Sequence, residues 1–60
     1  MNDIATRFGY DLEVDNYGHF MIHTNALNDK NAWMLAEGCD WDVERDNDGM
    51  MILYTNVKAV

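Results

Sequence analysis

The stretch "DNYGHFMIHTN" (15–25) decides the fold, because the chain repeats it as "DNDGMMILYTN" (46–56). An offset of 31 residues aligns the two copies. Seven pairs are identical between positions 11–26 and 42–57: Asp11/Asp42, Glu13/Glu44, Asp15/Asp46, Asn16/Asn47, Gly18/Gly49, Thr24/Thr55 and Asn25/Asn56. The sequence therefore predicts a duplicated structural unit.

Each copy has the pattern of a β-hairpin. Apolar and charged residues alternate in "YDLEV" (10–14) and "WDVER" (41–45), which is the period of a half-buried strand. The links "DNYG" and "DNDG" are turn sequences, since Asn and Asp tolerate left-handed backbone and glycine adopts positive φ freely. The return segments "HFMIHT" (19–24) and "MMILYT" (50–55) are rich in residues that fit a strand.

A short helix is predicted before each hairpin, in residues 2–9 and 28–38, because both segments contain helix formers and end in glycine. The candidate N-caps are Asn2 or Asp3 and Asn28, and the candidate stops are Gly9 and Gly38. Pairing these two glycines requires a two-residue shift from the offset of the hairpins.

These elements predict an α+β fold in one domain, 1–60, with repeat units 1–27 and 28–60. The simplest assembly of the duplicated α-β-β unit is a four-stranded antiparallel sheet with both short helices on one face. Its helix-facing side would carry Tyr10, Leu12, Val14, Phe20, Ile22, Trp41, Val43, Met51 and Leu53, covered by Ile4, Phe8, Leu27, Trp33, Met34 and Leu35. The order of the strands stays open.

The other sheet face is the candidate association surface. It would carry His19, Met21, His23, Met50, Ile52 and Tyr54. A chain of 60 residues buries a small core, and its single cysteine excludes an internal disulfide. We therefore expect a homo-oligomer, most simply a dimer, formed through this face or along a sheet edge; ordinary surface residues are the alternative.

The net charge of −7 limits the classes of partner. It disfavours direct binding of nucleic acid and of anionic membranes, both of which require clustered Lys and Arg. It permits binding to a basic protein surface, although an acidic surface also simply keeps a small protein soluble. The segment 1–8 has no signal-peptide pattern and no apolar run is long enough for a membrane span, so we expect a cytoplasmic protein.

The acidic segment before Gly49 resembles a calcium loop only in part. With Gly49 at loop position 6, Glu44, Asp46 and Asp48 fall at positions 1, 3 and 5, but Thr55 stands where the closing glutamate is needed. We therefore expect no cofactor and no metal. His19 and His23 lie about 13 Å apart along a strand, too far for one zinc ion.

Catalysis would require His19 beside Asp15 or Asp46 as a general acid–base pair. The second copy has Met50 in place of His19, and no nucleophile or phosphate-binding motif is present. Cys39 has the character of a structural cysteine rather than a nucleophile. We expect a protein that is not an enzyme.

Two resemblances arise at these residues. "FGYDLEVDNYGHF" (8–20) and "EGCDWDVERDNDGMMILYTN" (37–56), each at the end of a short helix, resemble small uncharacterised proteins of marine cyanophages that carry DNDG-type turns. This resemblance covers both hairpins and implies no activity. The first helix, strand and turn also resemble HicA-like toxins, which cut messenger RNA with a histidine, but only Gly18 and His19 match.

The leading hypothesis is a non-enzymatic protein-interaction module, such as a phage-type accessory or inhibitor that binds a basic host protein. Its contacts would come from the open face and from two further groups, the carboxylates Asp42, Glu44, Asp46 and Asp48 and the aromatic anchor Tyr17. A small histidine-dependent hydrolase and a metal-binding protein are the alternatives. Positions that differ between the copies, Tyr17/Asp48, His19/Met50 and His23/Tyr54, are the first places to look for function.

Overall fold

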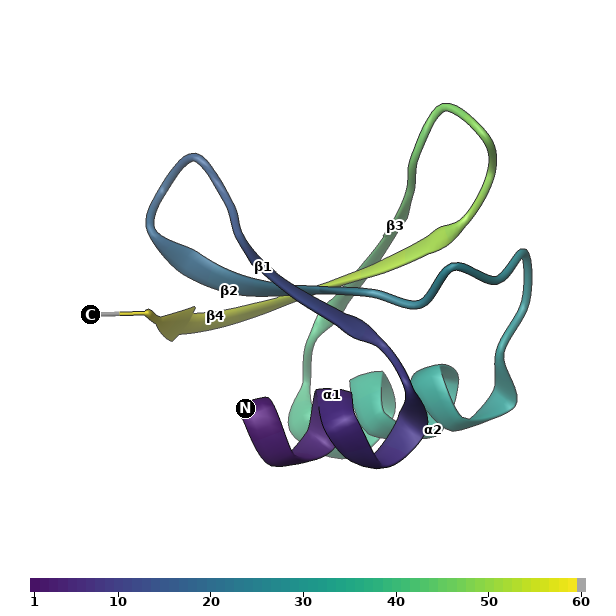
Figure 1. Cartoon of the computed structure of the whole chain (residues 1–60), viewed down its shortest axis with the longest axis horizontal. Coiled ribbons are helices and arrows are strands. Elements are labelled where there is room, and N and C mark those ends of the chain that lie inside the picture. Colours follow the sequence, from purple (N-terminus) through teal and green to yellow (C-terminus); the bar gives the residue numbers. More distant parts are fainter. Residues whose placement is uncertain (60) are drawn as a thin grey trace.

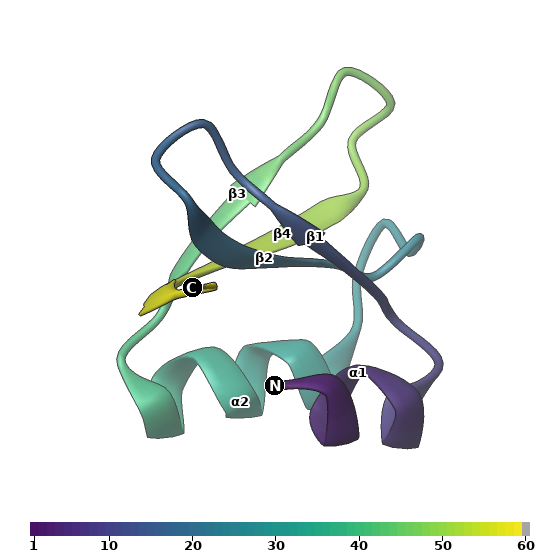
Figure 2. The ribbon, with the colours of Figure 1, turned by 60° about the vertical axis from the view of Figure 1, so that its left-hand side comes forward.

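A computed structural model describes residues 1–59 (Figure 1). In chain order its elements are α1 (Asn2–Phe8), β1 (Asp11–Val14), β2 (His19–His23), α2 (Lys30–Cys39), β3 (Asp42–Arg45) and β4 (Met51–Lys58). Both helices lie on one face of the sheet, and both hairpin turns point away from them (Figure 2). The predicted α+β fold, two helices on one face of a four-stranded antiparallel sheet, is confirmed.

The strand order is β1-β2-β4-β3, so the return strands of the two hairpins pair at the centre of the sheet. Their register places Ile22 opposite Leu53, which are equivalent residues of the two copies. On either side of this pair, Met21 lies opposite Tyr54 and His23 lies opposite Ile52. The 31-residue offset converts each of these two pairs into the other. An approximate two-fold axis therefore passes between Ile22 and Leu53. The two repeats of this one chain are related to each other as the two subunits of a symmetric dimer would be.

The same equivalence extends to the ends of the helices, where it corrects the predicted boundaries. Gly9 ends α1 in the left-handed region, as expected, but the residue that ends α2 in this way is Asp40, with φ of 58°. Gly38 lies inside α2, so the prediction that it stops the helix is wrong. Gly9 and Asp40 are related by the 31-residue offset, and no shift is needed.

The helix N-termini also differ from the prediction. The carboxylate of Asp29, rather than the side chain of Asn28, caps α2 by accepting the backbone N–H groups of Asn31 and Ala32. Helix α1 begins after Met1 without a side-chain cap, so neither Asn2 nor Asp3 has that role. Asp29 performs this task because a carboxylate at the N-cap both accepts N–H groups and opposes the positive end of the helix dipole.

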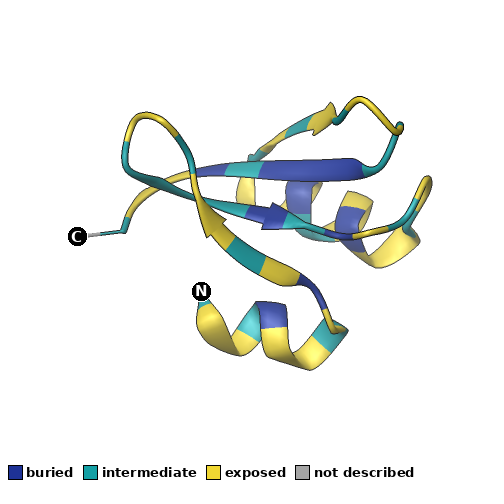
Figure 3. Ribbon diagram, turned by 45° about the horizontal axis from the view of Figure 1, so that its top comes forward, coloured by how far each residue is buried: buried dark blue, intermediate teal, exposed yellow. Residues whose placement is uncertain are grey.

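The core lies between the helices and the two central strands (Figure 3). Ile22, Met51 and Leu53 are fully buried, and each contributes about 1.5–3 kcal/mol of hydrophobic stabilisation. The helices meet the sheet through small side chains, Ala5 from α1 and the pair Ala32 and Ala36 from α2. Alanine at these positions allows the helix backbone to approach the sheet closely.

This use of alanine leaves several predicted core residues outside. Trp33 and Met34 are exposed, because α2 turns Ala32, Ala36 and the half-buried Leu35 toward the core. Leu27, in the loop before α2, is also exposed. Val14 is exposed at the end of the edge strand β1. Within residues 1–59 neither helix is long and apolar enough to cross a membrane.

Two buried threonines connect the halves of the sheet reciprocally. The Thr24 hydroxyl donates to the Met51 carbonyl oxygen at 3.0 Å, and the Thr55 hydroxyl donates to the Phe20 carbonyl oxygen at 2.9 Å. Each hydroxyl also accepts the backbone N–H two residues further on, across Asn25 or Asn56 in left-handed conformation. The repeated "TN" pair thus stabilises the end of each return strand in the same way.

Candidate functional site

The two hairpin turns are built alike around an aspartate. Asp15 Oδ1 accepts the backbone N–H groups of Tyr17 and His19, at 2.8 and 2.9 Å. Asp46 Oδ1 accepts the corresponding N–H groups of Asp48 and Met50 at the same two distances. In both turns, Oδ1 of the aspartate therefore accepts the N–H groups of the turn. The surroundings of the second oxygen, Oδ2, depend on the side chains beside it on the open sheet face.

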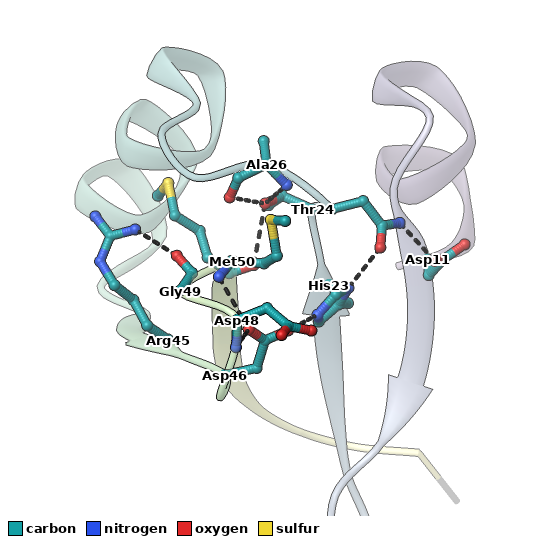
Figure 4. A network of polar contacts seen from close by, with 11 residues as sticks. Asp11, His23, Thr24, Ala26, Arg45, Asp46, Asp48, Gly49 and Met50 are labelled. Atoms are coloured by element: carbon teal, nitrogen blue, oxygen red, sulfur yellow. Dashed lines mark hydrogen bonds and ion pairs between the residues drawn. The ribbon is translucent and has the colours of Figure 1, made fainter.

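Beside the second turn, His23 completes a network of side chains (Figure 4). Its Nε2 lies 2.7 Å from Asp46 Oδ2, and its Nδ1 lies 2.9 Å from Asn25 Oδ1. The Asn25 amide nitrogen donates to Asp11 Oδ2 at 2.6 Å, so its oxygen faces the ring as an acceptor. Both ring nitrogens therefore face acceptors, an arrangement that only the doubly protonated imidazolium form of His23 satisfies completely.

The electrostatics of this network follow from its hydrogen bonds. The hydrogen bond to Asp46 raises the pKa of His23 above its usual 6.5, and Asn25 and the nearby charge of Glu13 act in the same direction against the opposing effect of burial. The same hydrogen bond lowers the pKa of Asp46 below 3.8, assisted by the N–H groups of Met50 and Asp48. The pair is largely covered, with 17% and 26% of the two side chains exposed.

The two-fold relation places Tyr54 beside Asp15 where His23 lies beside Asp46, and here the structure is open. A groove of about 570 Å³ lies between the first turn and the outer face of β3 and β4. Its lining comes from Asp15, Asn16, Tyr17 and His19 on one side and from Asp42, Glu44, Arg45, Tyr54 and Asn56 on the other. These residues define what we call the Tyr54 groove.

Polar groups in the Tyr54 groove lack the partners that their equivalents have. Within residues 1–59, Asp15 Oδ2 makes no hydrogen bond, whereas Asp46 Oδ2 binds His23. No side-chain hydrogen bond joins Asp42 to Asn56 in this part of the chain, although Asp11 and Asn25 are so joined. The guanidinium of Arg45 donates to the carbonyl oxygens of Gly49, in its own turn, and of Leu27, in the loop before α2, so both contacts hold that cation to backbone.

Five of the eleven residues that sequence reasoning selected meet at the Tyr54 groove: Tyr17, His19, Asp42, Glu44 and Tyr54. Two others, His23 and Asp46, form the closed network beside the second turn. Asp48 is exposed at the tip of that turn, and Met21 and Met50 are half-buried. Ile52 was expected on an open face, but it is buried to 8% exposure between the neighbouring strand residues His23 and Glu44.

Sequence reasoning missed Asp15, Asn16, Arg45 and Asn56 as members of this groove. The signal for Asp15 and Asn56 was present in the repeat, because their equivalents Asp46 and Asn25 are identical residues. The strand order, which sequence alone did not provide, is what brings the first turn next to the strands of the second copy.

The geometry also bears on the alternative chemistries. The His19 ring makes no hydrogen bond to a carboxylate within residues 1–59. Both ring nitrogens of His23 are hydrogen-bonded to side chains of the protein, so neither of these two nitrogens is free to accept a substrate proton. In the same residues no three His, Cys, Asp or Glu side chains are arranged to hold a metal ion. Cys39 is exposed at the end of α2 beside a smaller apolar hollow between the helices, and both hairpin turns point away from the helices (Figure 2).

Comparison of the chain with protein-family models, curated proteins and solved structures gave no match.

Proposed function

We propose that the protein is a non-enzymatic interaction module that binds a basic segment of another protein at the Tyr54 groove. The observation that carries this proposal is the meeting of three carboxylates, Asp15, Asp42 and Glu44, with Tyr17 and Tyr54 at one concave site. Carboxylates attract a basic chain, and tyrosines supply large contact area at low entropic cost. Such binding would let the protein act as an accessory or inhibitor of its partner.

The main competitor is a surface whose acidic residues only confer solubility. Net charge alone has that effect, wherever the carboxylates lie. The two explanations differ in location, because Asp3 on α1 and Glu37 on α2 are also exposed carboxylates but lie on the helix layer, away from the groove. A specific site responds at the groove alone, whereas a merely charged surface responds at every carboxylate.

A second copy of the chain would compete for the same face. Burial of Ile52 removes part of the apolar surface that a dimer would use there, and two copies that each carry a charge of −7 repel one another. The edge strands β1 and β3 carry exposed Asp11, Glu13, Asp42 and Glu44, which also oppose edge-to-edge pairing. The proposal therefore assigns the open face to a basic partner in preference to a dimer contact.

The test is an NMR titration of the ¹⁵N-labelled protein with a short peptide of alternating arginine and glycine. It is run at low salt and at about 150 mM NaCl, where charges more than about 8 Å apart are screened. The proposal expects saturable shifts that persist at the higher salt and are confined to the amides of residues 15–19, 42–45 and 54–56. Shifts that do not saturate, that also appear at Asp3 and Glu37, or that vanish at the higher salt would assign the acidic residues to solubility alone.

A further inference from the structure

We propose, building on the proposed function, that the Tyr54 groove holds an arginine side chain of the partner. Its guanidinium would lie beside Asp15 as the imidazolium of His23 lies beside Asp46 in the related network. The inference names the group that the groove recognises, and it rests on a comparison between the two halves of this one chain.

The closed network shows what this arrangement of residues binds. Around His23, an aspartate of the turn and an asparagine two residues after the end of β2 place acceptor oxygens at 2.7 and 2.9 Å from the two nitrogens of the planar ring. The equivalent aspartate and asparagine, Asp15 and Asn56, both line the Tyr54 groove. Tyr54, which is equivalent to His23, is not a cationic residue. The groove therefore has the same two acceptor residues as the closed network but no side chain equivalent to the imidazole between them.

The free acceptor is a specific atom. Asp15 Oδ1 is occupied by the turn, while Oδ2 has no hydrogen-bond partner within residues 1–59. Asp42 and Glu44 add two more carboxylates to the same groove, and His19 and the anchored Arg45 are the groups of opposite or titratable charge. The acidic side chains thus outnumber the fixed cation, and the groove favours a ligand that brings a positive charge.

The shape of the missing group favours arginine over lysine. A guanidinium is planar and presents several N–H groups in different directions, as the His23 imidazolium presents two. It can therefore bridge a carboxylate and an amide oxygen, and it stacks readily on an aromatic ring such as that of Tyr54 or Tyr17. An ammonium group is compact and strongly hydrated, so it would satisfy one acceptor at a time.

The experiment compares two peptides on four proteins. The peptides have the same length and alternate glycine with either arginine or lysine; the proteins are the wild type, Asp15→Asn, Tyr54→His and the control Asp48→Asn. Asparagine at 15 keeps the oxygen that accepts the N–H groups of the turn and removes the free carboxylate oxygen. The control makes the same change of charge at an exposed residue of the other turn. Affinity is measured by calorimetry, and the fold of each variant by its ¹⁵N spectrum.

The proposal expects the arginine peptide to bind the wild type about threefold or more tightly than the lysine peptide. Asp15→Asn should weaken the arginine peptide by about fivefold or more, and Asp48→Asn by less than about twofold. Tyr54→His should abolish the preference for arginine by supplying an internal cation to Asp15, and it keeps the proposal testable if the substitution at 15 disturbs the turn.

Equal affinity for both peptides would overturn the inference while leaving the proposed function in place. Equal losses in Asp15→Asn and Asp48→Asn would overturn both, because a merely charged surface responds at every carboxylate. Retention of the arginine preference in Tyr54→His would overturn the inference. If neither peptide binds the wild type, the proposed function fails together with the inference.

Discussion

Replacement of Thr24 or Thr55 by valine tests the two-fold architecture through its most buried polar groups. The two side chains are 6% and 4% exposed, and valine has nearly the same shape as threonine. Each substitution removes the hydroxyl that donates to the carbonyl of the neighbouring copy and accepts a backbone N–H on its own strand. The loss is therefore one of hydrogen bonds rather than of packing.

The magnitude follows from those bonds. The carbonyl of Met51 keeps one partner, the backbone N–H of Thr24 at 3.1 Å, so removing the hydroxyl does not leave it bare. The N–H of Ala26, in contrast, loses the hydroxyl oxygen as acceptor. We expect each variant to lose about 1–2 kcal/mol of unfolding free energy, near the lower end of the range for an unsatisfied buried group. For a domain of this size that corresponds to a fall in Tm of about 4–16 °C.

Thermal and urea unfolding followed by circular dichroism measure the effect. Thr6→Val is the matched control, because Thr6 is exposed on α1 and makes no side-chain hydrogen bond within residues 1–59. If Thr24→Val and Thr55→Val are as stable as this control, the hydroxyls do not stabilise the sheet. If one of them costs about 1 kcal/mol more than the other, the two sites are not equivalent and the two-fold reasoning fails.

Three further outcomes are expected. Tyr10→Phe should raise Tm, because the buried hydroxyl of Tyr10 makes no hydrogen bond of good geometry within residues 1–59. Burial, together with the Asp29 carboxylate that the hydroxyl faces, raises the pKa of Tyr10 to about 12, and an unchanged or lower Tm would show that the hydroxyl donates to Asp29. Asp40→Gly should stabilise by about 0.5–1 kcal/mol, since glycine removes the cost of the left-handed backbone at the end of α2, and destabilisation would contradict this. Because the pKa of His23 is raised in the folded protein, its contribution to stability is complete below pH 6.5 and is lost as pH rises through the folded pKa. Because the pKa of Asp46 is lowered, its contribution is present above pH 3.8 and is lost as pH falls through the folded pKa. Tm should therefore decrease above pH 6.5 in the wild type but less in His23→Gln, and equal slopes in the two proteins would refute the link.

Much of the fold could be predicted from local sequence. The repeated turns and the alternation of apolar and charged residues specify two hairpins, because side-chain period and turn chemistry are short-range properties. The end of α2 was misjudged because glycine is the usual left-handed residue, whereas aspartate can also adopt that conformation. The repeat itself contained the correction, since Asp40 is 31 residues after Gly9.

The face that α2 buries could not be predicted in the same way. Trp33, Met34 and Leu35 are adjacent large apolar residues that point in different directions around a helix, so hydrophobicity alone does not choose among them. In the structure α2 buries Ala32 and Ala36 and packs Leu35 partly against the core, and this choice depends on how closely the helix approaches the sheet. Ile52 was misjudged for a related reason, because neighbouring strands cover it on the open face.

The candidate site was partly visible from the positions at which the copies differ. Tyr17, His19 and Tyr54 were selected on that basis, and all three line the groove. The pairing of His23 with Asp46 could not be found from sequence, because the two residues come from different repeats and meet only through the central pairing of β2 with β4. Once that pairing is known, the equivalence of the closed network and the open groove follows.

The central claim is that His23 supplies a positive charge to one of two equivalent sites and that Tyr54 leaves the other without one. The most direct measurement is an NMR pH titration of both imidazole rings, with ¹⁵N shifts that report the protonation of each nitrogen. The account predicts that His23 keeps both ring protons at pH values above 6.5 and that it loses one of them at a lower pH in Asp46→Asn, in which the carboxylate that contributes most to its raised pKa is gone. A His23 ring that titrates at or below 6.5, or whose titration is unchanged in Asp46→Asn, would contradict the account.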